Sequence, residues 1–302
     1  MNGVLIIDKP ADITSHDVVE QVRRVTGIKK IGHGGTLDPF ATGVLLILVG
    51  STTRLMEYIN MMSKTYAAEI TLGATSDTDD ITGEILKSKT RAGKTPEARA
   101  ALVSFLGRQQ QTPPSYSAIK VKGQKAYQAA RKGTPLKLKP RVVNIYNIQL
   151  IDYQYPVLSL TVTCSSGTYI RALARDIGEK LKTGAYLSKL CRTSIELSLT
   201  KPNKNMKQKF TLENAVKLDQ LTASNLTSHL LPPSTLVAHL PLIILSQSNV
   251  AQLRNGQKIE WGSTNLTWSP EQPIALFTKD NQLIGIGHFD PATRLLSPKK
   301  IL

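Results

Sequence analysis

The sequence has few cysteines, few aromatic residues and no long hydrophobic run. Its two cysteines, Cys164 and Cys191, are too few and too far apart for a disulfide framework or a cysteine-rich metal site. The five histidines show no metal-ligand spacing. No apolar stretch approaches the roughly 20 residues that span a bilayer, and neither a secretory signal nor a nucleotide-binding fingerprint is present. These absences predict a cytoplasmic protein that uses no metal, no cofactor and no membrane.

Acidic residues are also scarce, with 22 Asp and Glu against 38 Lys and Arg, a net charge of +16 and a pI near 9.8. A chain this basic usually binds a polyanion, most often a nucleic acid. The stretch 108–141 holds nine Lys or Arg and no acid, with Tyr116 and Tyr127 among them. A solubilising surface would mix the two signs, whereas one sign with interleaved aromatics favours phosphate contact and base stacking. The candidate backbone contacts are Lys120, Lys122 and Lys125.

At 302 residues the chain is long enough for two domains. Apolar patterns predict strands over 3–7, 65–72, 141–151, 157–164 and 193–199, and helices that begin near 15, 95 and 168. Thr14 or Ser15 can cap the first helix and Gly27 can end it, and the composition of 78–83 predicts a turn. We expect mainly helical packing over 213–240, ending in a Pro-rich joint. From 241 onward, short apolar runs alternate with turns, which is typical of a small β-barrel. This second part holds six basic and four acidic residues, so most of the net charge lies in residues 1–240.

Residues 32–44 contain four glycines, one carboxylate at Asp38, and Pro39 directly behind it. The glycines allow the backbone to bend tightly, and Pro39 biases Asp38 away from helical geometry. The apolar run 44–49 that follows indicates a buried element that anchors this loop. From the residues alone, Asp38 either stabilises the turn or caps a helix, as Asp often does, or carries chemistry; the structural role is the more common one.

The sequence GHGGTLDPFATGVL in this loop closely resembles the signature of the TruB family, the branch of the pseudouridine synthases that modifies the T-arm of tRNA. In that family the Asp of the GTLDP segment is the nucleophile. The resemblance therefore implies that Asp38 is the catalytic nucleophile. It also implies the pseudouridine synthase fold, an α+β architecture with a mixed, largely antiparallel central sheet and flanking helices.

A second resemblance lies at 164–171, where CSSGTYIR matches another signature of the family. A strand ends here and a helix begins, so Tyr169 and Arg171 fall in its first turn. Taken singly, each could be structural, Tyr169 as a core aromatic and Arg171 as a surface residue. The resemblance implies that Tyr169 packs on the target base and accepts its proton, and that Arg171 pairs with Asp38. A guanidinium beside a carboxylate keeps it ionised and oriented.

Further matches continue the resemblance in order to about residue 193. The match at Lys64-Thr65-Tyr66 implies that Tyr66 stacks on the flipped uracil. By the same resemblance, His33 would prop the RNA loop open and Leu190 would line the pocket. The segment 111–120 is similar to a family segment in the region that grips the T-arm. Two positions depart from the family pattern, which commonly has His at 186 and Arg at 191 where this chain has Tyr186 and Cys191. These departures put nearby RNA contacts in doubt.

The resemblance implies a stand-alone enzyme that converts uridine 55 of tRNA to pseudouridine without a cofactor. Residues 1–240 would form the catalytic domain, with an RNA-gripping insertion at about 108–141. Residues 241–302 resemble the RNA-binding module called PUA and would contact the acceptor stem. We expect a monomer with no obligatory protein partner. Two alternatives remain at this point: a non-catalytic tRNA-folding chaperone, and the catalytic subunit of a guide-RNA particle.

Overall fold

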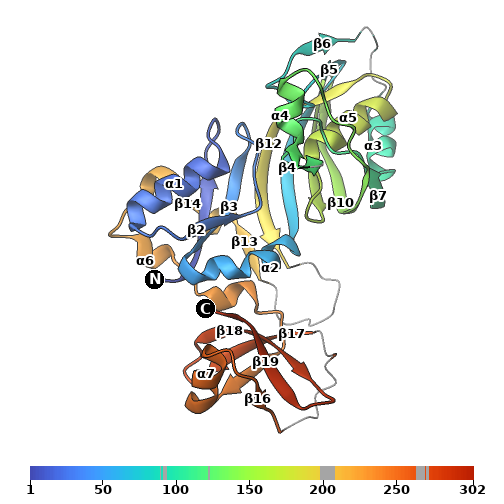
Figure 1. The fold of residues 1–302 in the computed structure, drawn as a ribbon. Coiled ribbons are helices and arrows are strands. Elements are labelled where there is room, and N and C mark those ends of the chain that lie inside the picture. The colour runs from blue at the N-terminus through green and yellow to red at the C-terminus, as the bar shows by residue number, and fades with distance from the viewer. Residues whose placement is uncertain (89, 91–93, 122, 198–207, 263–268, 270–271) are drawn as a thin grey trace.

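The computed structural model describes residues 1–302 except 89, 91–93, 122, 198–207, 263–268 and 270–271. Two sheets dominate the described residues, a large one built by the first part of the chain and a five-stranded one built by the last part (Figure 1). The N- and C-termini lie near the junction between the two (Figure 1). No helix in the described part of the chain is long and apolar enough to cross a membrane.

The large sheet has ten strands, eight of which form a continuous path in the order β14-β1-β3-β12-β4-β11-β10-β7, with β13 and β2 paired beside it. Most neighbours are antiparallel, whereas β1 with β14 and β12 with β3 run parallel. This confirms the expected mixed, largely antiparallel sheet. The strands are β1 (Gly3–Lys9), β2 (Ile31–Gly34), β3 (Thr42–Val49), β4 (Ser63–Leu72), β7 (Gly107–Gln111), β10 (Arg141–Gln154), β11 (Val157–Cys164), β12 (Ala185–Glu196), β13 (Lys209–Thr211) and β14 (Val216–Lys217).

Alternation along the strands divides the buried residues between two faces of this sheet. Leu5 and Ile7 of β1 belong to the core under α1 (Ser15–Thr26), α3 (Thr95–Val103) and α5 (Ile170–Lys180). Val4 and Ile6 belong to a second core on the opposite face, under the 3₁₀ helix η1 (Gly50–Leu55) and α2 (Met56–Asn60). The central strands β1 and β3 are therefore covered on both sides.

Local signals explain where the helices begin and end. Thr14 caps α1 through a capping box with Asp17, and Gly27 ends the helix at φ +69°. Pro96 stands in the first turn of α3, as its fixed φ permits. These are the boundaries that the sequence predicts.

The basic stretch 108–141 forms small elements beside the large sheet. They are β8 (Lys120–Val121), β9 (Gln124–Lys125) and α4 (Ala126–Arg131), with β8 and β9 paired as a hairpin. A further short pair, β5 (Ala74–Ser76) with β6 (Ile85–Lys87), lies near α5 (Figure 1).

The last part of the chain forms a five-stranded sheet in the order β15-β17-β18-β19-β16, with α7 beside it. This agrees with the expected β module. Ala275, Leu283 and Ile286 of this sheet are buried in the same core as Leu46 and Leu48 of β3. The elements are β15 (Leu242–Leu245), α7 (Gln247–Arg254), β16 (Ile259–Glu260), β17 (Pro273–Thr278), β18 (Leu283–Asp290) and β19 (Leu295–Ile301).

The expectation of mainly helical packing over 213–240 is wrong. The structure has only brief turns of helix there, with a parallel strand pairing between β14 and β1. Val216 and Lys217 pair with Ile7 and Asp8 at the edge of the large sheet, so strand pairing rather than a helical repeat sets the backbone there. The helical turns are η2 (Leu212–Asn214), η3 (Leu218–Gln220), α6 (Leu226–His229) and η4 (Pro233–Leu236).

Candidate active site

A cavity of about 820 Å³ opens beside the loop that carries Asp38. The size falls in the range of about 300–1,000 Å³ typical of small-molecule sites. It brings together residues that lie far apart in the sequence. The sequence-predicted residues that line it are His33, Asp38, Tyr66, Tyr169, Arg171 and Leu190.

The loop that carries Asp38 is held from behind by buried side chains. The Ser15 hydroxyl accepts a hydrogen bond from the Leu37 N–H at 2.9 Å and donates to the Leu37 carbonyl at 3.2 Å. Lys9 is fully buried, and its Nζ donates to the carbonyls of Pro10, Ile13 and Pro39 at 2.7, 2.7 and 3.0 Å. The backbone is thus held at Leu37 and Pro39, the residues before and after Asp38. The Asp38 side chain itself is 30% exposed.

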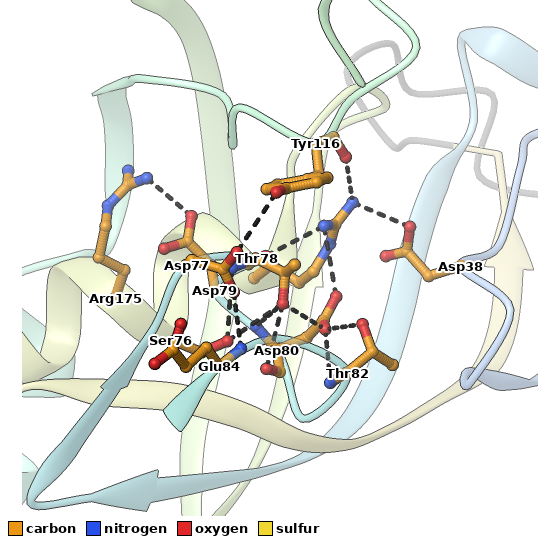
Figure 2. A network of polar contacts seen from close by, with 11 residues as sticks. Asp38, Ser76, Asp77, Thr78, Asp79, Asp80, Thr82, Glu84, Tyr116 and Arg175 are labelled. Carbon is orange, nitrogen blue, oxygen red and sulfur yellow. Dashed lines mark hydrogen bonds and ion pairs between the residues drawn. The ribbon is translucent and has the colours of Figure 1, made fainter. Parts of the chain in front are cut away.

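Arg171 joins two carboxylates at the base of the cavity. Its Nη2 lies 2.9 Å from Asp38 Oδ1, and its Nη1 lies 3.3 Å from Asp80 Oδ2. Nη1 also donates to the Thr78 carbonyl at 3.1 Å, and Nη2 to the Tyr116 carbonyl at 3.1 Å. Figure 2 shows Asp38 and Asp80 in this network, with the Tyr116 ring above it. Because the guanidinium is 5% exposed and held by four partners, its orientation toward Asp38 is fixed.

Asp80 is itself locked by neighbouring hydroxyls. Its Oδ1 accepts hydrogen bonds from the Thr78 hydroxyl at 2.8 Å, the Thr82 hydroxyl at 2.5 Å and the Thr82 N–H at 2.9 Å. Next to it, Asp79 pairs with Arg175 at 2.9 Å (Figure 2). The sequence marks 78–83 only as a turn, so the contribution of Asp80 to the site was not predicted. Asp80 and Arg171 meet only through the tertiary fold.

Tyr169 directly precedes α5 and is held by residues of β7 and β10. Its N–H donates to Gln111 Oε1 at 2.8 Å, and its carbonyl accepts from Gln111 Nε2 at 3.0 Å. The Arg141 guanidinium carbon lies 4.5 Å from the centre of the Tyr169 ring. The Gln111 and Arg141 side chains therefore position Tyr169 in the wall of the cavity.

Tyr66 and Leu190 come from the adjacent strands β4 and β12. Tyr66 is 8% exposed, and burial raises the pKa of its phenol, so the ring is neutral near pH 7. Arg192, two residues after Leu190 on the same strand, is 1% exposed and lines the same cavity. Its Nε donates to the Val44 carbonyl at 2.7 Å and its Nη2 to the Gly35 carbonyl at 3.0 Å. This arginine was not predicted, although it follows the matched Leu190 closely.

The charged side chains that line the cavity are mostly basic, so the cavity favours an anionic ligand. Five basic side chains line it against two acidic ones, namely Lys64, Arg131, Arg141, Arg171 and Arg192 against Asp38 and Asp80. Burial raises the pKa of the Asp38 carboxyl above its usual value, and the positive charge of Arg171 opposes this shift. Burial also lowers the pKa of His33, with Arg192 acting in the same direction, so the imidazole is neutral at pH 7.

Comparison with known proteins identifies the family to which this arrangement belongs. A family model described as TruB family pseudouridylate synthase (N terminal domain) matches residues 23–170. The tRNA pseudouridine synthase B of Dehalococcoides mccartyi is 41% identical over 291 residues, which cover 95% of this chain and 92% of the relative. That of Bacillus subtilis is 38% identical over 314 residues, covering 100% of this chain and 98% of the relative. The chain belongs to the TruB family.

Solved structures share the fold of this TruB-family chain at lower identity. The structure described as "H/ACA RNP bound to a substrate RNA containing 2'-deoxyuridine" superposes with a TM-score of 0.71 at 22% identity, covering 99% of this chain and 84% of that chain. An archaeal box H/ACA Nop10–Cbf5 complex gives 0.69 at 22% identity, covering 99% and 85%. The likeness to these two structures thus extends over nearly the whole chain, including its C-terminal sheet.

The other sequence-predicted residues that the structure describes do not line the cavity of this TruB-family chain. Lys120 and Lys125 face each other across the β8–β9 hairpin and do not line the cavity, and Lys122 lies outside the described residues. The two departures from the family pattern, Tyr186 and Cys191, do not line it either. Cys191 lines a separate, largely apolar groove with Glu69 and Lys189. No group of three or more His, Cys, Asp or Glu among the described residues could hold a metal ion.

Proposed function

We propose that this chain is a tRNA pseudouridine synthase that isomerises uridine 55 in the T-arm loop. The observation that carries this proposal is the pair formed by Asp38 and Arg171 at 2.9 Å, at the base of a basic cavity that aromatic side chains line. The relatives named tRNA pseudouridine synthase B support tRNA as the substrate. A cytoplasmic site of action fits this substrate.

The proposed reaction begins with eversion of the uridine from its stacked loop. Eversion costs a few kcal/mol, and stacking on Tyr66 together with His33 in the vacated space offsets this cost. Asp38 then forms a bond to the uracil ring or to the anomeric carbon, and Arg171 keeps the attacking carboxylate ionised. The N-glycosidic bond breaks, the base turns within the cavity, and C5 joins C1′. The bond to Asp38 then breaks, which returns the carboxylate to its free state.

The last step removes the proton from C5, with Tyr169 as the acceptor or as the group that orients it. The product is an isomer of uridine, because N1 gains a proton while C5 loses one, so the isomerisation consumes no oxidant, reductant or nucleotide. A carboxylate, a guanidinium and two phenols are sufficient for it. Leu190 contributes an apolar wall against the base.

The basic hairpin and the C-terminal module would dock the rest of the tRNA. Like charges directly opposite each other destabilise a β-hairpin, and Lys120 and Lys125 stand in that relation. A bound phosphate backbone would remove this cost. We assign residues 1–240 to catalysis and residues 241–302 to a PUA-type contact with the acceptor stem, in a monomer without a protein partner.

The deciding experiment replaces the nucleophile. Asp38→Asn keeps the shape of the side chain and removes its charge, so tRNA affinity should stay within a few-fold while pseudouridine formation falls below detection. Tritium release from tRNA labelled at uridine C5 measures turnover, and filter binding measures affinity. Turnover by Asp38→Asn at the wild-type rate would remove the assignment. A non-catalytic chaperone predicts no pseudouridine from the wild-type protein either.

A further inference from the structure

The backbone at Tyr169 lacks the usual helix cap. Tyr169 precedes α5 in an extended conformation, and its side chain makes no capping hydrogen bond. Buried backbone N–H groups at a helix start need a partner. The Gln111 amide provides one, since it accepts from the Tyr169 N–H and donates to the Tyr169 carbonyl. Gln111 is 3% exposed, so this two-point contact is sheltered from water.

The Tyr169 ring is held separately by Arg141. Its guanidinium carbon lies 4.5 Å from the ring centre, well within the range of a cation–π contact of about 6 Å. Among the ion pairs of the described residues none involves Arg141. Its Nε is buried without a hydrogen-bond partner. The Arg141 charge is therefore directed at the aromatic face and into the cavity that Arg141 lines.

Gln111 and Arg141 belong to one structural unit. They stand directly opposite each other in the antiparallel pairing of β7 with β10. The turn that leads to Tyr169 is tied to the same strand: the Ser165 N–H donates to the Asn144 carbonyl at 2.8 Å, and the Asn144 N–H donates to the Ser165 hydroxyl at 2.9 Å. One end of the β7–β10 pair thus fixes the backbone, the ring and the approach to Tyr169.

We propose that Gln111 and Arg141 are positioning residues that hold the Tyr169 phenol in its reactive orientation, Gln111 through the backbone and Arg141 through the ring face. This rests on the proposed function, in which Tyr169 acts at C5 of the everted base. A displacement of about 1 Å in a reacting group costs up to about 100-fold in rate. The pair should therefore affect the chemical step and leave RNA affinity unchanged.

The test compares kcat and KM for uridine-containing T-arm RNA. Gln111→Glu has the same shape and still accepts from the Tyr169 N–H, but it cannot donate to the carbonyl. Arg141→Met removes the charge and keeps the aliphatic stem. We expect each to lower kcat about 10–100-fold with KM within twofold, and Arg141→Lys to restore kcat to within about fivefold of wild type. Gln149→Glu, at an exposed position of β10, is the matched control and should match wild type.

The opposite results are equally clear. Wild-type kcat in both Gln111→Glu and Arg141→Met would overturn the proposal, as would a loss confined to KM, which would make Arg141 a phosphate contact. If Gln111→Glu does not fold, the comparison of Arg141→Met with Arg141→Lys decides, because Arg141 is only partly buried. If the wild-type protein makes no pseudouridine, the proposed function fails instead. Crystal structures of wild type and Arg141→Met then test the positioning role, and a Tyr169 ring that does not move in Arg141→Met overturns it.

Discussion

Arg171 connects two carboxylates in very different surroundings. Asp80 is 5% exposed and accepts three further hydrogen bonds, whereas Asp38 is 30% exposed and has the guanidinium as its main partner. Leaving one charge of a buried ion pair without its partner is strongly destabilising. The buried Asp80 therefore holds Arg171 in place as a charged group, and Arg171 in turn presents its second nitrogen to the exposed carboxylate.

The Asp38 environment predicts the acid limb of the pH–rate profile. Burial raises the pKa of the Asp38 carboxyl above 3.8, and the charge of Arg171 opposes the rise. In the proposed mechanism Asp38 attacks as a carboxylate, so the single-turnover rate should fall as the pH drops through this raised pKa. Arg171→Gln removes the opposing charge and should move the limb to higher pH while lowering the plateau. Rates at saturating RNA from pH 4.5 to 8 test this, and an acid limb in Arg171→Gln at or below that of wild type would contradict it.

At the same scale, the sequence predicts some site residues and misses others for a physical reason. Asp38, Tyr169 and Arg171 lie within short signature segments, and the structure brings them to one cavity. Asp80 lies in a turn whose Asp and Thr residues have an ordinary structural use. Its role depends on a contact with a helix 91 positions later in the chain, which no local pattern encodes.

Among the elements, β1 supports the loop that carries Asp38 through Lys9. Its ammonium is buried and donates to three carbonyls. One belongs to Ile13, just before α1, and another to Pro39, directly after Asp38. Burial lowers the pKa of Lys9 to about 8. Because the unfolded chain holds this proton up to about pH 10.5, the contribution of Lys9 to stability increases as the pH rises from about 8 toward 10.5.

Lys9→Met should loosen this loop. Three partly buried carbonyls would lose their donor, at a cost of about 2 kcal/mol in the free energy of unfolding, and the rate of pseudouridine formation should fall with it. Lys217→Met, at an exposed position of the neighbouring strand β14, is the matched control. Urea unfolding at pH 7 measures the difference between the two. Equal stability of the two variants would show that the three hydrogen bonds contribute nothing net.

The β8–β9 hairpin makes a prediction that depends on its charge. Lys120→Glu with Lys125→Glu replaces a repelling cationic pair by a repelling anionic one, so folding should change little. If both lysines contact phosphates, tRNA affinity should drop and the slope of log K against log salt should become shallower by about 1.5–2. Lys180→Glu with Lys182→Glu, at exposed positions near the end of α5, is the control pair. An unchanged slope would place the RNA contact elsewhere.

Element boundaries followed from the sequence where a local signal exists. The capping box at Thr14 and Gly27 fixed both ends of α1 as expected. The strand expected over 193–199 instead spans Ala185–Glu196. It lies between β3 and β4 in the sheet, and its hydrogen-bonded pairing with β4 extends over this whole length. Tertiary pairing, which is invisible to local propensity, sets its length.

For the whole molecule, one of the three hydrophobic clusters of the described residues is shared by the two sheets, while each sheet also has a core of its own. Ile286 of the five-stranded sheet is buried in the core that also contains Leu48 and Tyr58. Polar contacts reinforce this junction: Lys300 pairs with Glu57 at 2.8 Å and donates to the Arg54 carbonyl at 3.0 Å. The sequence marks the change of composition at 241, but composition cannot show that a module packs its apolar face against its neighbour.

The shared core predicts that the two parts unfold together. Ile286→Ala removes buried methyl groups from the junction and should cost roughly 2–5 kcal/mol, with the whole chain still unfolding in one calorimetric transition at a lower temperature. Ile244→Ala, on a side chain that is 51% exposed, should leave the transition unchanged. A second, separate transition in Ile286→Ala, with the catalytic part at its wild-type temperature, would mean that the C-terminal sheet is an independent unit. Because α2 supplies Tyr58 to this core and Asn60 to the catalytic cavity, a cooperative loss should also lower turnover near the transition.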